Sequence, residues 1–321
     1  KNSNLFEFEK FLTKKFNYVS GIDYEKLFNW TIRNPKLFWS SIWEYSKIKG
    51  IKNDRFYFPK EIIKSKFLLK SKLNYAENLL LKNNNSKAVT FISENGYREE
   101  KSWKELNRNT LKLINFLKKI KIKENDRIAA YTANQIETVE SFLATSAIGA
   151  IWSSCSPDFG SQGVIERFSQ IRPKLLIITD RYYYNGKEIN ILERLPTILK
   201  NIKSIKNVLI ISYPGKKNLR QKKIKGIKIF YYNKLNDKKE KKITFKKFDF
   251  DKELAILYSS GTTGKPKCIC HRAGGVLLQH LKEHKLHCNI KEGDNVFYFT
   301  TCGWMMWNWL MTFLASKASI V

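Results

Sequence analysis

Cysteine is scarce in this sequence, and no secretion signal is evident. The 321 residues include five cysteines, none of which forms a Cys-x-x-Cys pair. Secreted scaffolds held by disulfides use denser, regularly paired cysteines, so that class of protein is excluded. The first residues also lack a basic segment followed by an apolar run and a small-residue cleavage site. We therefore predict a reducing, cytoplasmic location.

Long apolar runs are missing as well. The most apolar stretch, residues 302–321, is interrupted by Asn308 and Lys317, which argues against a membrane span. This stretch continues to the last residue without a polar tail or a helix cap. We therefore expect no membrane partner, and we expect the chain to stop within a fold.

Acidic residues are few. The chain has 29 Asp and Glu against 59 Lys and Arg, which gives a formal net charge of +30. Only 11 of the basic residues are Arg, the residue that binds phosphate and guanine through two hydrogen bonds. Residues 216–247 alone hold 14 basic and 2 acidic residues, or +12 of the total. We interpret the excess as a solvated, lysine-rich face that A/T-rich codons would favour, with a nucleic-acid-binding module as the alternative.

The rest of the composition is that of a folded globular protein. Hydrophobic residues make up 43% and aromatic residues 14%, and 321 residues favour two domains or one large one. Before residue 86, aromatic residues recur three and four positions apart, as Trp39 and Trp43 do, which predicts amphipathic helices. We predict a helical N-terminal extension over residues 1–85 and a second domain over residues 86–321.

In the second part, short apolar runs alternate with helical patterns. The Glu-Asn-Gly turn at residues 94–96 predicts a β-hairpin between residues 88–93 and 97–101. A helix is expected over residues 103–120. The alternation after it predicts an α/β fold with a mostly parallel sheet, flanked by helices on both faces. The expected strands are 127–131, 150–153, 175–179, 208–211 and 254–258, and the expected helices are 135–148, 161–171 and 187–200.

A dense polar motif follows the last expected strand. Residues 258–267 read Tyr-Ser-Ser-Gly-Thr-Thr-Gly-Lys-Pro-Lys. Hydroxyls and backbone N–H groups can surround phosphate oxygens, glycines allow close approach, and lysines supply positive charge. The motif is not a Walker loop, because only two residues separate Gly261 from Gly264, and Pro266 stands where Ser or Thr would hold magnesium. It predicts a mobile polyphosphate-binding loop between the strand and a helix after residue 271.

The motif resembles the phosphate loop of the adenylate-forming superfamily, which contains acyl-CoA synthetases, firefly-type luciferases and peptide-synthetase adenylation domains. Residues 73–80 (LNYAENLL) and 302–309 (CGWMMWNW) resemble the acetoacetyl-CoA synthetase branch. The likeness covers essentially the whole chain. It implies the large N-terminal domain of the adenylate-forming fold, truncated at its C-terminal end.

The resemblance also implies a two-step reaction with acetoacetate, ATP and CoA as substrates. The carboxylate attacks the α-phosphorus of ATP and releases pyrophosphate, and the CoA thiol then attacks the acyl-adenylate and releases AMP. Because the nucleophiles belong to the substrates, the protein contributes positioning and charge stabilisation. A Glu that holds Mg²⁺, an Asp for the ribose and a catalytic Lys are expected beyond residue 321, so the catalytic residues stay unknown and the chain alone is expected to be inactive.

The resemblance assigns two groups of phosphate contacts. By its spacing before the strand at residue 175, Arg167 matches an arginine of acetyl-CoA synthetases that contacts the 3′-phosphate region of CoA. The alternative is that Arg167 is an ordinary surface residue of a helix. Lys267 is expected to face the ATP phosphates, whereas Lys265 is expected to face solvent more. The implied ATP phosphate-binding residues are Ser259, Ser260, Gly261, Thr262, Thr263, Gly264, Lys265 and Lys267.

The same resemblance implies a pocket for the acyl group of the acid. Residues 302–309 contain no acidic residue, whereas amino-acid-activating relatives have an Asp there for the substrate ammonium group. An apolar wall suits an acid without an amine. Asn308 or an indole N–H could donate a hydrogen bond to a β-keto oxygen. The implied pocket residues are His271, Trp304, Met305, Met306, Trp307 and Asn308, whereas Trp309 and Met311 are expected in the core.

All four histidines fall within residues 271–287. The segment His280-Leu281-Lys282-Glu283-His284 has the spacing of a zinc-peptidase helix. The same interval suits a polar helix face, and no downstream acidic ligand can be identified, so we predict no metal site. His271 is expected either to contact the ligand or to fill the core.

Three alternative functions stay open. The protein could activate another short acid such as acetate or propionate. Testing which acid causes pyrophosphate release would distinguish these substrates. It could be a noncatalytic fragment, which the rest of the reading frame would decide. It could be a basic nucleic-acid-binding module, which predicts duplex binding that weakens steeply with salt.

Overall fold

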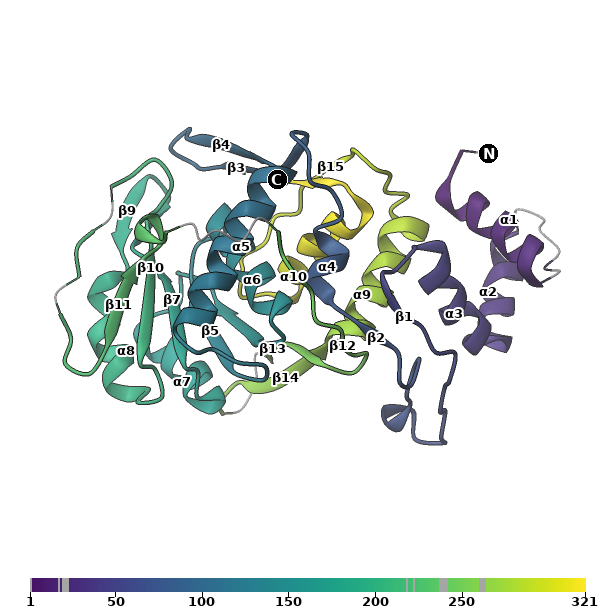
Figure 1. The fold of residues 1–321 in the computed structure, drawn as a ribbon, viewed down its shortest axis with the longest axis horizontal. Helices are drawn as coiled ribbons and strands as arrows, with labels where there is room; N and C mark the ends of the chain where they lie inside the picture. Colours follow the sequence, from purple (N-terminus) through teal and green to yellow (C-terminus); the bar gives the residue numbers. More distant parts are fainter. Residues whose placement is uncertain are drawn as a thin grey trace.

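Seven strands form the central sheet of the structure, a computed structural model that describes residues 2–16, 18, 23–217, 219–221, 223–236, 242–259 and 264–321 (Figure 1). Neighbouring strands run parallel except for the last two, which are antiparallel. In spatial order the strands are β11 (Lys228–Tyr231), β10 (Asn207–Ile211), β7 (Leu175–Thr179), β5 (Arg127–Tyr131), β6 (Ile151–Cys155), β13 (Glu253–Ser259) and β14 (Lys267–Arg272).

Helices cover both faces of this sheet (Figure 1). Every residue of β6 and β7 is buried, as expected for central strands of a parallel sheet that is protected on both sides. The mostly parallel α/β fold predicted from the sequence is therefore confirmed. The helices that follow the strands are α5 (Trp103–Lys119), α6 (Ile136–Ala147), α7 (Ser161–Ile171) and α8 (Leu195–Asn201).

Helix α6 lies between the central sheet and a second, smaller sheet. It contacts β6 on one side and β3 (Lys87–Ile92) on the other, and it buries every residue except Glu137. A helix that is buried all round needs apolar or small side chains on every face, which is why its sequence shows little amphipathic pattern. The second sheet has the order β15 (Asn295–Val296), β16 (Ser319–Ile320), β3 and β4 (Arg98–Ser102).

The N-terminal residues form helices at one end of the molecule (Figure 1). Strand β2 (Lys72–Leu73) pairs with both β1 (Gly50–Ile51) and β12 (Phe248–Asp249), so residues before 85 share a small sheet with residues after 85. A division into domains at residue 85 stays a prediction. The helices at this end are α1 (Asn4–Phe16), α2 (Tyr24–Arg33) and α3 (Pro35–Tyr45), whereas α4 (Tyr75–Leu79) packs against α6 in the middle of the molecule.

One predicted helix is wrong in its first part. Residues 187–200 were expected to be helical, but β9 (Lys187–Asn190) pairs with β8 (Arg181–Tyr184), and α8 begins only at Leu195. The cause is the Asn185-Gly186 turn, in which both residues have positive φ angles of 50° and 73°. Such a pair forms the tight turn that matches the twist of a β-hairpin. The other predicted strands and helices are present, with ends shifted by one or two residues.

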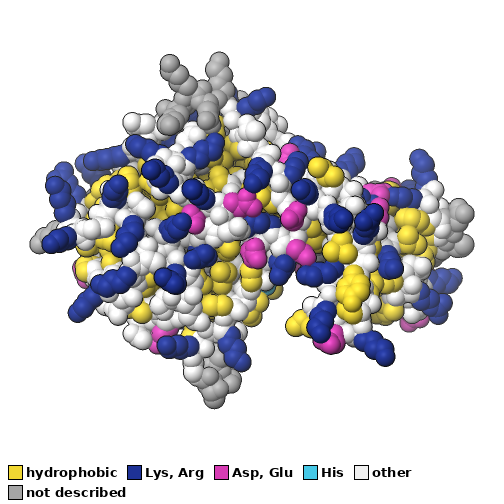
Figure 2. Space-filling view, turned by 60° about the horizontal axis from the view of Figure 1, so that its bottom comes forward, with side chains coloured by type: hydrophobic (Ala, Val, Ile, Leu, Met, Phe, Trp, Pro, Cys, Tyr) yellow, Lys and Arg dark blue, Asp and Glu magenta, His cyan; other side chains and the backbone are white. Residues whose placement is uncertain are grey.

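Basic side chains are spread over the surface. Figure 2 shows Lys and Arg across the whole face, with Asp and Glu between them, and no single basic patch. A large net charge of one sign keeps a surface hydrated and hinders self-association. Separately, no helix in the described ranges is long and apolar enough to cross a membrane.

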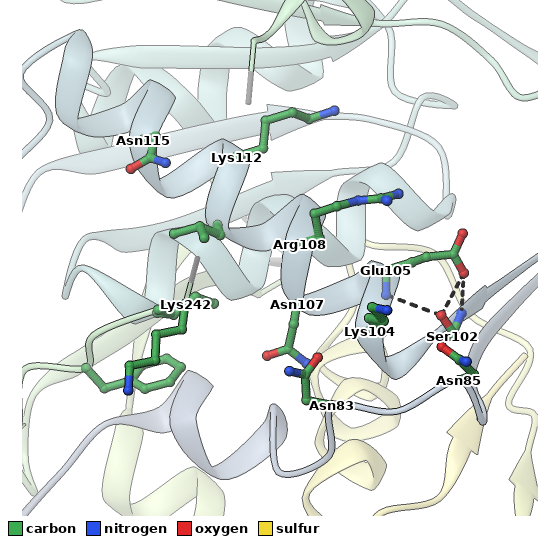
Figure 3. Close-up of a pocket in the computed structure, with 13 residues that line it drawn as sticks. Asn83, Asn85, Ser102, Lys104, Glu105, Asn107, Arg108, Lys112, Asn115 and Lys242 are labelled. Atoms are coloured by element: carbon green, nitrogen blue, oxygen red, sulfur yellow. Dashed lines mark hydrogen bonds between the residues drawn. The ribbon is translucent and has the colours of Figure 1, made fainter. Parts of the chain in front are cut away.

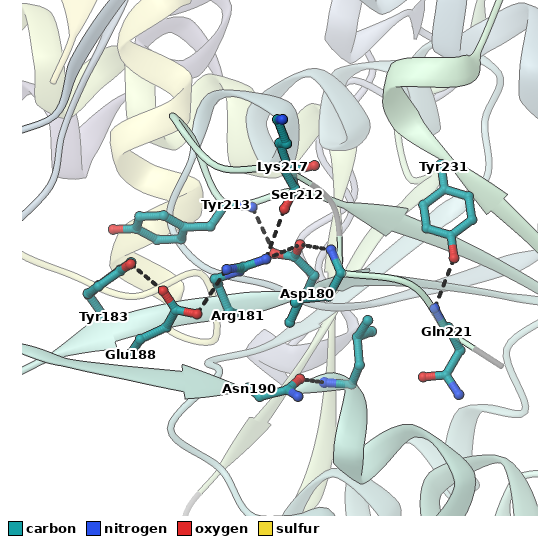
Figure 4. A network of polar contacts seen from close by, with 12 residues as sticks. Asp180, Arg181, Tyr183, Glu188, Asn190, Ser212, Tyr213, Lys217, Gln221 and Tyr231 are labelled. Carbon is teal, nitrogen blue, oxygen red and sulfur yellow. Dashed lines mark hydrogen bonds and ion pairs between the residues drawn. The ribbon is translucent and has the colours of Figure 1, made fainter.

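A buried carboxylate anchors the loop after β10. Asp180 is fully buried, and its two oxygens accept hydrogen bonds from the backbone N–H groups of Tyr213 and Leu219, each at 2.9 Å (Figure 4). Arg181 lies 3.4 Å from the same carboxylate and donates to Glu188 at 2.8 Å. Because these partners satisfy the Asp180 charge, we interpret this network as a structural anchor.

A second buried carboxyl group lies on α6. Glu140 is almost fully buried, receives a hydrogen bond of 2.7 Å from the Asn109 side chain, and accepts one from the Tyr232 hydroxyl. Burial, followed by repulsion from Glu137, raises the pKa of Glu140 to about 8. The folded chain therefore keeps a proton here at pH values where the unfolded chain has lost it.

This difference predicts a pH-dependent stability. Between the ordinary pKa of 4.5 and about 8, the folded state binds one more proton at Glu140 than the unfolded state. The free energy of unfolding should therefore fall as pH rises, by up to about 1.4 kcal/mol per pH unit. Glu140→Gln removes this titration. In urea unfolding, the free energy of unfolding of the variant relative to that of the parent chain should therefore increase as pH rises across that range. The exposed Glu61→Gln should show no such growth, and an equal pH slope in parent and Glu140→Gln would contradict the assignment.

Candidate functional site

The predicted phosphate motif lies on a hairpin between β13 and β14. Ser259, the last residue of β13, pairs with Lys267, the first residue of β14. Lys267 was expected in a loop that leads to a helix, and this is wrong, because residues 267–272 form a strand. The helix α9 (Ala273–Lys282) begins directly after that strand. Ser260, Gly261, Thr262 and Thr263 lie outside the described residues.

Both lysines of the motif are exposed. Gly264 has a φ angle of 97°, a conformation that favours glycine, and it begins the return toward β14. Lys265 and Lys267 lie on either side of the buried Pro266. Since Lys267 stands opposite Ser259 in the ladder, their side chains project from the same face of the hairpin. The different roles assigned to the two lysines stay a prediction.

Helix α7 holds one arm of the hairpin in place. The Gln170 side chain donates to the Pro266 carbonyl at 2.8 Å. Arg167, one turn earlier, stacks its guanidinium 4.2 Å from the Phe159 ring centroid and lies 5.9 Å from that of Tyr258. The structure thus places Arg167 beside the residue that precedes Ser259, with one N–H already donated to the Gly163 carbonyl at 2.9 Å.

The apolar segment before helix α10 (Met305–Thr312) is fixed at the same edge of the sheet. The Cys302 thiol donates to the Thr132 carbonyl at 2.8 Å, and the Ser154 hydroxyl donates to the Cys302 carbonyl at 2.5 Å. A side chain at Gly303 would come within 3.0 Å of the Ser156 backbone nitrogen. These contacts hold the segment against the carboxyl ends of β5 and β6, the edge at which open α/β sheets bind ligands.

A cavity of about 590 Å³ lies between α9 and α10, beside the end of β14. His271 stands opposite Ala255 in the ladder, four residues before Ser259, so the cavity is set back from the loop by about 13 Å along the strand. Its wall combines residues predicted for the acyl pocket with others that were not predicted. Five residues that line it are His271, His280, Met305, Met306 and Trp309.

The other predicted pocket residues lie elsewhere. Trp307 is fully buried, stacks on Trp152 with ring centroids 6.2 Å apart, and donates to the Asn134 side chain at 2.8 Å. Asn308 is 2% exposed, and neither end of its amide has a partner among the described residues. Trp304 is 65% exposed at the start of α10. Roles for these three in acid binding stay predictions.

Two residues of the cavity wall were missed. Trp309 was expected in the core, yet it lines the cavity, and its indole N–H donates to Glu283 at 2.8 Å. Glu283 brings a carboxylate that residues 302–309 lack, and its other oxygen accepts from Gln279 at 2.7 Å. Val276, Gln279 and Glu283 recur at helical spacing, so one face of α9 could have been recognised from the sequence.

His280 on α9 and His284 in the turn that follows it are part of the interior. The turn over Glu283–His287 places His284 against Phe313, with stacked ring centroids 3.5 Å apart. Burial lowers the pKa of His284 to about 2 and that of His280 to about 3, so both rings are neutral. Within the described ranges, no group of three or more His, Cys, Asp and Glu could hold a metal.

A larger hollow, of about 780 Å³, lies beside α5 (Figure 3). Its lining includes Lys104, Arg108 and Lys112, and the Ser102 and Glu105 pair that caps the helix. None of its lining residues belongs to the hairpin, to α9 or to α10. We therefore place the candidate site at the hairpin and the smaller cavity, despite the greater size of this hollow.

The chain is similar to several known proteins. Residues 81–321 match the family described as AMP-binding enzyme. The chain is 39% identical over 302 residues to the acetoacetyl-coenzyme A synthetase of Rhizobium meliloti (strain 1021), covering 94% of this chain and 46% of that protein. It is 41% identical over 308 residues to the acetoacetyl-CoA synthetase of Gallus gallus, covering 93% and 46%. The structure of an acetoacetyl-CoA synthetase from Streptomyces lividans superposes with a TM-score of 0.90 at 28% identity, covering 100% of this chain and 49% of that one. The chain thus spans about half the length of these relatives.

The buried His284 predicts a loss of stability in mild acid. Its folded pKa lies near 2, well below the ordinary 6.5, so the unfolded state binds one more proton as pH falls below 6.5. The free energy of unfolding should then drop by up to about 1.4 kcal/mol per pH unit. His284→Phe keeps the stack and removes the titration, so urea unfolding should show a shallower acid slope. The exposed His287→Gln is the comparison: burial also lowers the pKa of His287, but less strongly, so this variant should change the acid slope less than His284→Phe does. An unchanged slope in His284→Phe would contradict the assignment.

Proposed function

Since the chain belongs to the AMP-binding enzyme family, we propose that its protein joins acetoacetate to CoA through an acetoacetyl-adenylate, with release of pyrophosphate and AMP. The choice of acetoacetate as the acid and CoA as the thiol is supported by the relatives, which are acetoacetyl-CoA synthetases by name. The observation that carries the proposal is the juxtaposition, on one β-hairpin, of the hydroxyl-rich, lysine-rich motif and the cavity at His271.

The hairpin would hold the triphosphate of ATP. Ser259 and Lys267 project together from one face at the root of the loop, where a hydroxyl and an ammonium group can contact phosphate oxygens. The loop residues between them would supply backbone N–H groups and further hydroxyls. As the carboxylate attacks the α-phosphorus, negative charge builds on the leaving pyrophosphate, and nearby cations stabilise that charge.

The cavity between α9 and α10 would hold the acid. Met305 and Met306 give it an apolar, adaptable wall, and His271 offers a neutral polar group, because burial lowers the pKa of His271. Glu283 is the acidic residue in the wall, but its two oxygens already accept from Gln279 and Trp309. These two bonds fix the Glu283 carboxylate in the wall, and the proposal treats amino acids as poor substrates.

The remaining partners follow from the same proposal. Arg167 would contact the 3′-phosphate region of CoA from α7, beside the root of the loop. Mg²⁺ would accompany ATP, with its protein ligand supplied from outside this chain. The substrates are small and anionic, and we propose a cytoplasmic enzyme that binds neither nucleic acid nor membrane.

The direct test is acid-dependent pyrophosphate exchange by the complete protein. Acetoacetate should support exchange of labelled pyrophosphate into ATP, whereas acetate and propionate should support it poorly. CoA should then convert the adenylate into acetoacetyl-CoA. Preference for acetate or propionate would replace the proposed acid, and no exchange with any acid would end the enzymatic proposal.

Lys267 should matter more than Lys265 for adenylate formation. In the complete protein, Lys267→Ala should slow acetoacetate-dependent pyrophosphate exchange by roughly 30- to 900-fold, the effect of losing one charge contact worth about 2 to 4 kcal/mol in the transition state. Lys265→Ala is the matched control, because it removes the same charge two residues away. Equal losses in the two variants would refute the separate roles.

Met306 should limit the room for the acid. Met306→Trp fills part of the cavity, so it should raise the KM for acetoacetate several-fold and leave the KM for ATP nearly unchanged. Steady-state kinetics with each substrate varied in turn separates the two effects. If both KM values rise together, or if the variant activates amino acids as well as acetoacetate, Met306 is not part of the acyl wall.

A further inference from the structure

The Gln170 side chain on α7 contacts both chain neighbours of Lys267. Its amide nitrogen lies 2.8 Å from the Pro266 carbonyl oxygen, and its amide oxygen lies 3.6 Å from the Cys268 thiol. The same nitrogen lies 2.8 Å from the carbonyl oxygen of Glu166, one helical turn earlier on α7. One side chain therefore holds the chain on either side of the lysine that we expect to meet the ATP phosphates.

The hydrogen-bond partners fix the orientation of this amide. Both oxygen atoms beside the Gln170 nitrogen belong to backbone carbonyls, which can only accept. A flipped amide would place its own oxygen against these two carbonyl oxygens, with no proton between them. The nitrogen therefore donates one N–H to each carbonyl, and the amide oxygen accepts from the Cys268 thiol. Gln170 thus uses both of its N–H groups and its oxygen, and two of these three bonds reach the return arm of the hairpin.

The position of Cys268 shows which way Lys267 faces. Successive side chains of a strand project to opposite faces of the sheet. Cys268 and its ladder partner Tyr258 face α7, where the Arg167 guanidinium lies 5.9 Å from the Tyr258 ring centroid. Lys267 and its ladder partner Ser259 therefore face away from α7. Gln170 and the lysine stand on opposite faces of the same strand.

The return arm has few other contacts that could fix this facing. Pro266 has no N–H group, and it stands one residue beyond the paired part of β14. Lys267 is exposed, so burial does not hold its side chain in place. A twist of this arm about its own axis would move the Lys267 ammonium group away from Ser259. The bonds from Gln170 on both sides of Lys267 oppose such a twist.

We infer that Gln170 is a positioning residue for adenylate formation, because it holds the return arm so that Lys267 faces the triphosphate. Gln170 lies on the other face of the strand, so it acts through Lys267 and does not contact ATP. The inference rests on the proposed function in taking the ATP phosphates as the ligand of Lys267. The same geometry gives no such role to Gln162 on the same helix, whose side chain donates to the Glu166 carboxylate at 2.9 Å.

A double-mutant cycle in the complete protein tests whether Gln170 acts through Lys267. Gln170→Leu removes the hydrogen bonds and should slow acetoacetate-dependent pyrophosphate exchange about three- to tenfold, the effect of one or two neutral hydrogen bonds. In the Lys267→Ala background the same change should slow exchange less than about twofold, because the group that Gln170 positions is gone. Equal slowing in both backgrounds would indicate a general structural role and overturn the inference.

Two further variants separate hydrogen bonding from packing. Gln170→Glu keeps the shape of the side chain, but its carboxylate cannot donate to the two carbonyls, so near neutral pH it should slow exchange at least as much as Gln170→Leu. Gln162→Leu is the matched control and should keep the parent rate. Because Gln170 is exposed, its variants should keep the parent's unfolding midpoint in urea. The parent rate in Gln170→Glu, equal slowing by Gln162→Leu, or a lowered midpoint in Gln170→Leu would contradict the inference.

Binding of inorganic tripolyphosphate separates this inference from the proposed function. Titration calorimetry of the complete protein with this probe needs no acid. Gln170→Leu should weaken tripolyphosphate binding about three- to tenfold in the parent background and less than about twofold in the Lys267→Ala background. If the complete protein activates no acid, the proposed function fails, while this comparison still decides the inference. No tripolyphosphate binding by the parent protein, or equal weakening in both backgrounds, overturns the inference.

Discussion

The antiparallel pairing of β13 with β14 is the constraint on which the site depends. Every other pair of neighbours in the central sheet is parallel. Because β14 runs back along β13, Lys267 lies beside Ser259 at the end of β13, whereas His271 lies beside Ala255, further back along that strand. The turn places the polar loop at the carboxyl edge of the sheet, and the return strand carries His271 to the start of α9. A loop that led straight into a helix would leave the acid cavity without this wall.

Burial of polar groups is the second constraint, and it is met in different ways at different places. Backbone N–H groups and Arg181 face the Asp180 carboxylate, whereas burial and then repulsion from Glu137 raise the pKa of Glu140. His280 stays neutral and uses one nitrogen on Thr312. Burial thus sets the direction of the pKa shift at Glu140 and His280, and the hydrogen-bond partners satisfy the polar atoms that burial removes from water.

The sequence reveals most of the architecture and only part of the site. Alternating apolar runs identify the strands because burial in a parallel sheet requires them, and the failure at residues 187–190 came from an Asn-Gly turn that was not recognised. The motif on the hairpin was visible because its chemistry is local. The contribution of Glu283 was missed. Helical spacing could have grouped Glu283 with Val276 and Gln279, but it could not show that this face and residues 302–309 close the same cavity. Contacts between distant segments are tertiary information that periodicity alone does not contain.

The two parts of the site differ in exposure and in net charge, and this difference would orient the substrate of the proposed function. At the hairpin, Lys265 and Lys267 are exposed and free to meet a polyphosphate. In the cavity, burial lowers the pKa of His271 and His280, so both rings are neutral, and the two charged side chains of the wall, Glu283 and Arg272, have opposite signs. Removing a charged phosphate chain from water costs less free energy at the exposed hairpin than in the cavity. Burying the uncharged end of a small acid in the cavity costs little. The polarity of the site therefore favours one direction of binding before any specific contact is made.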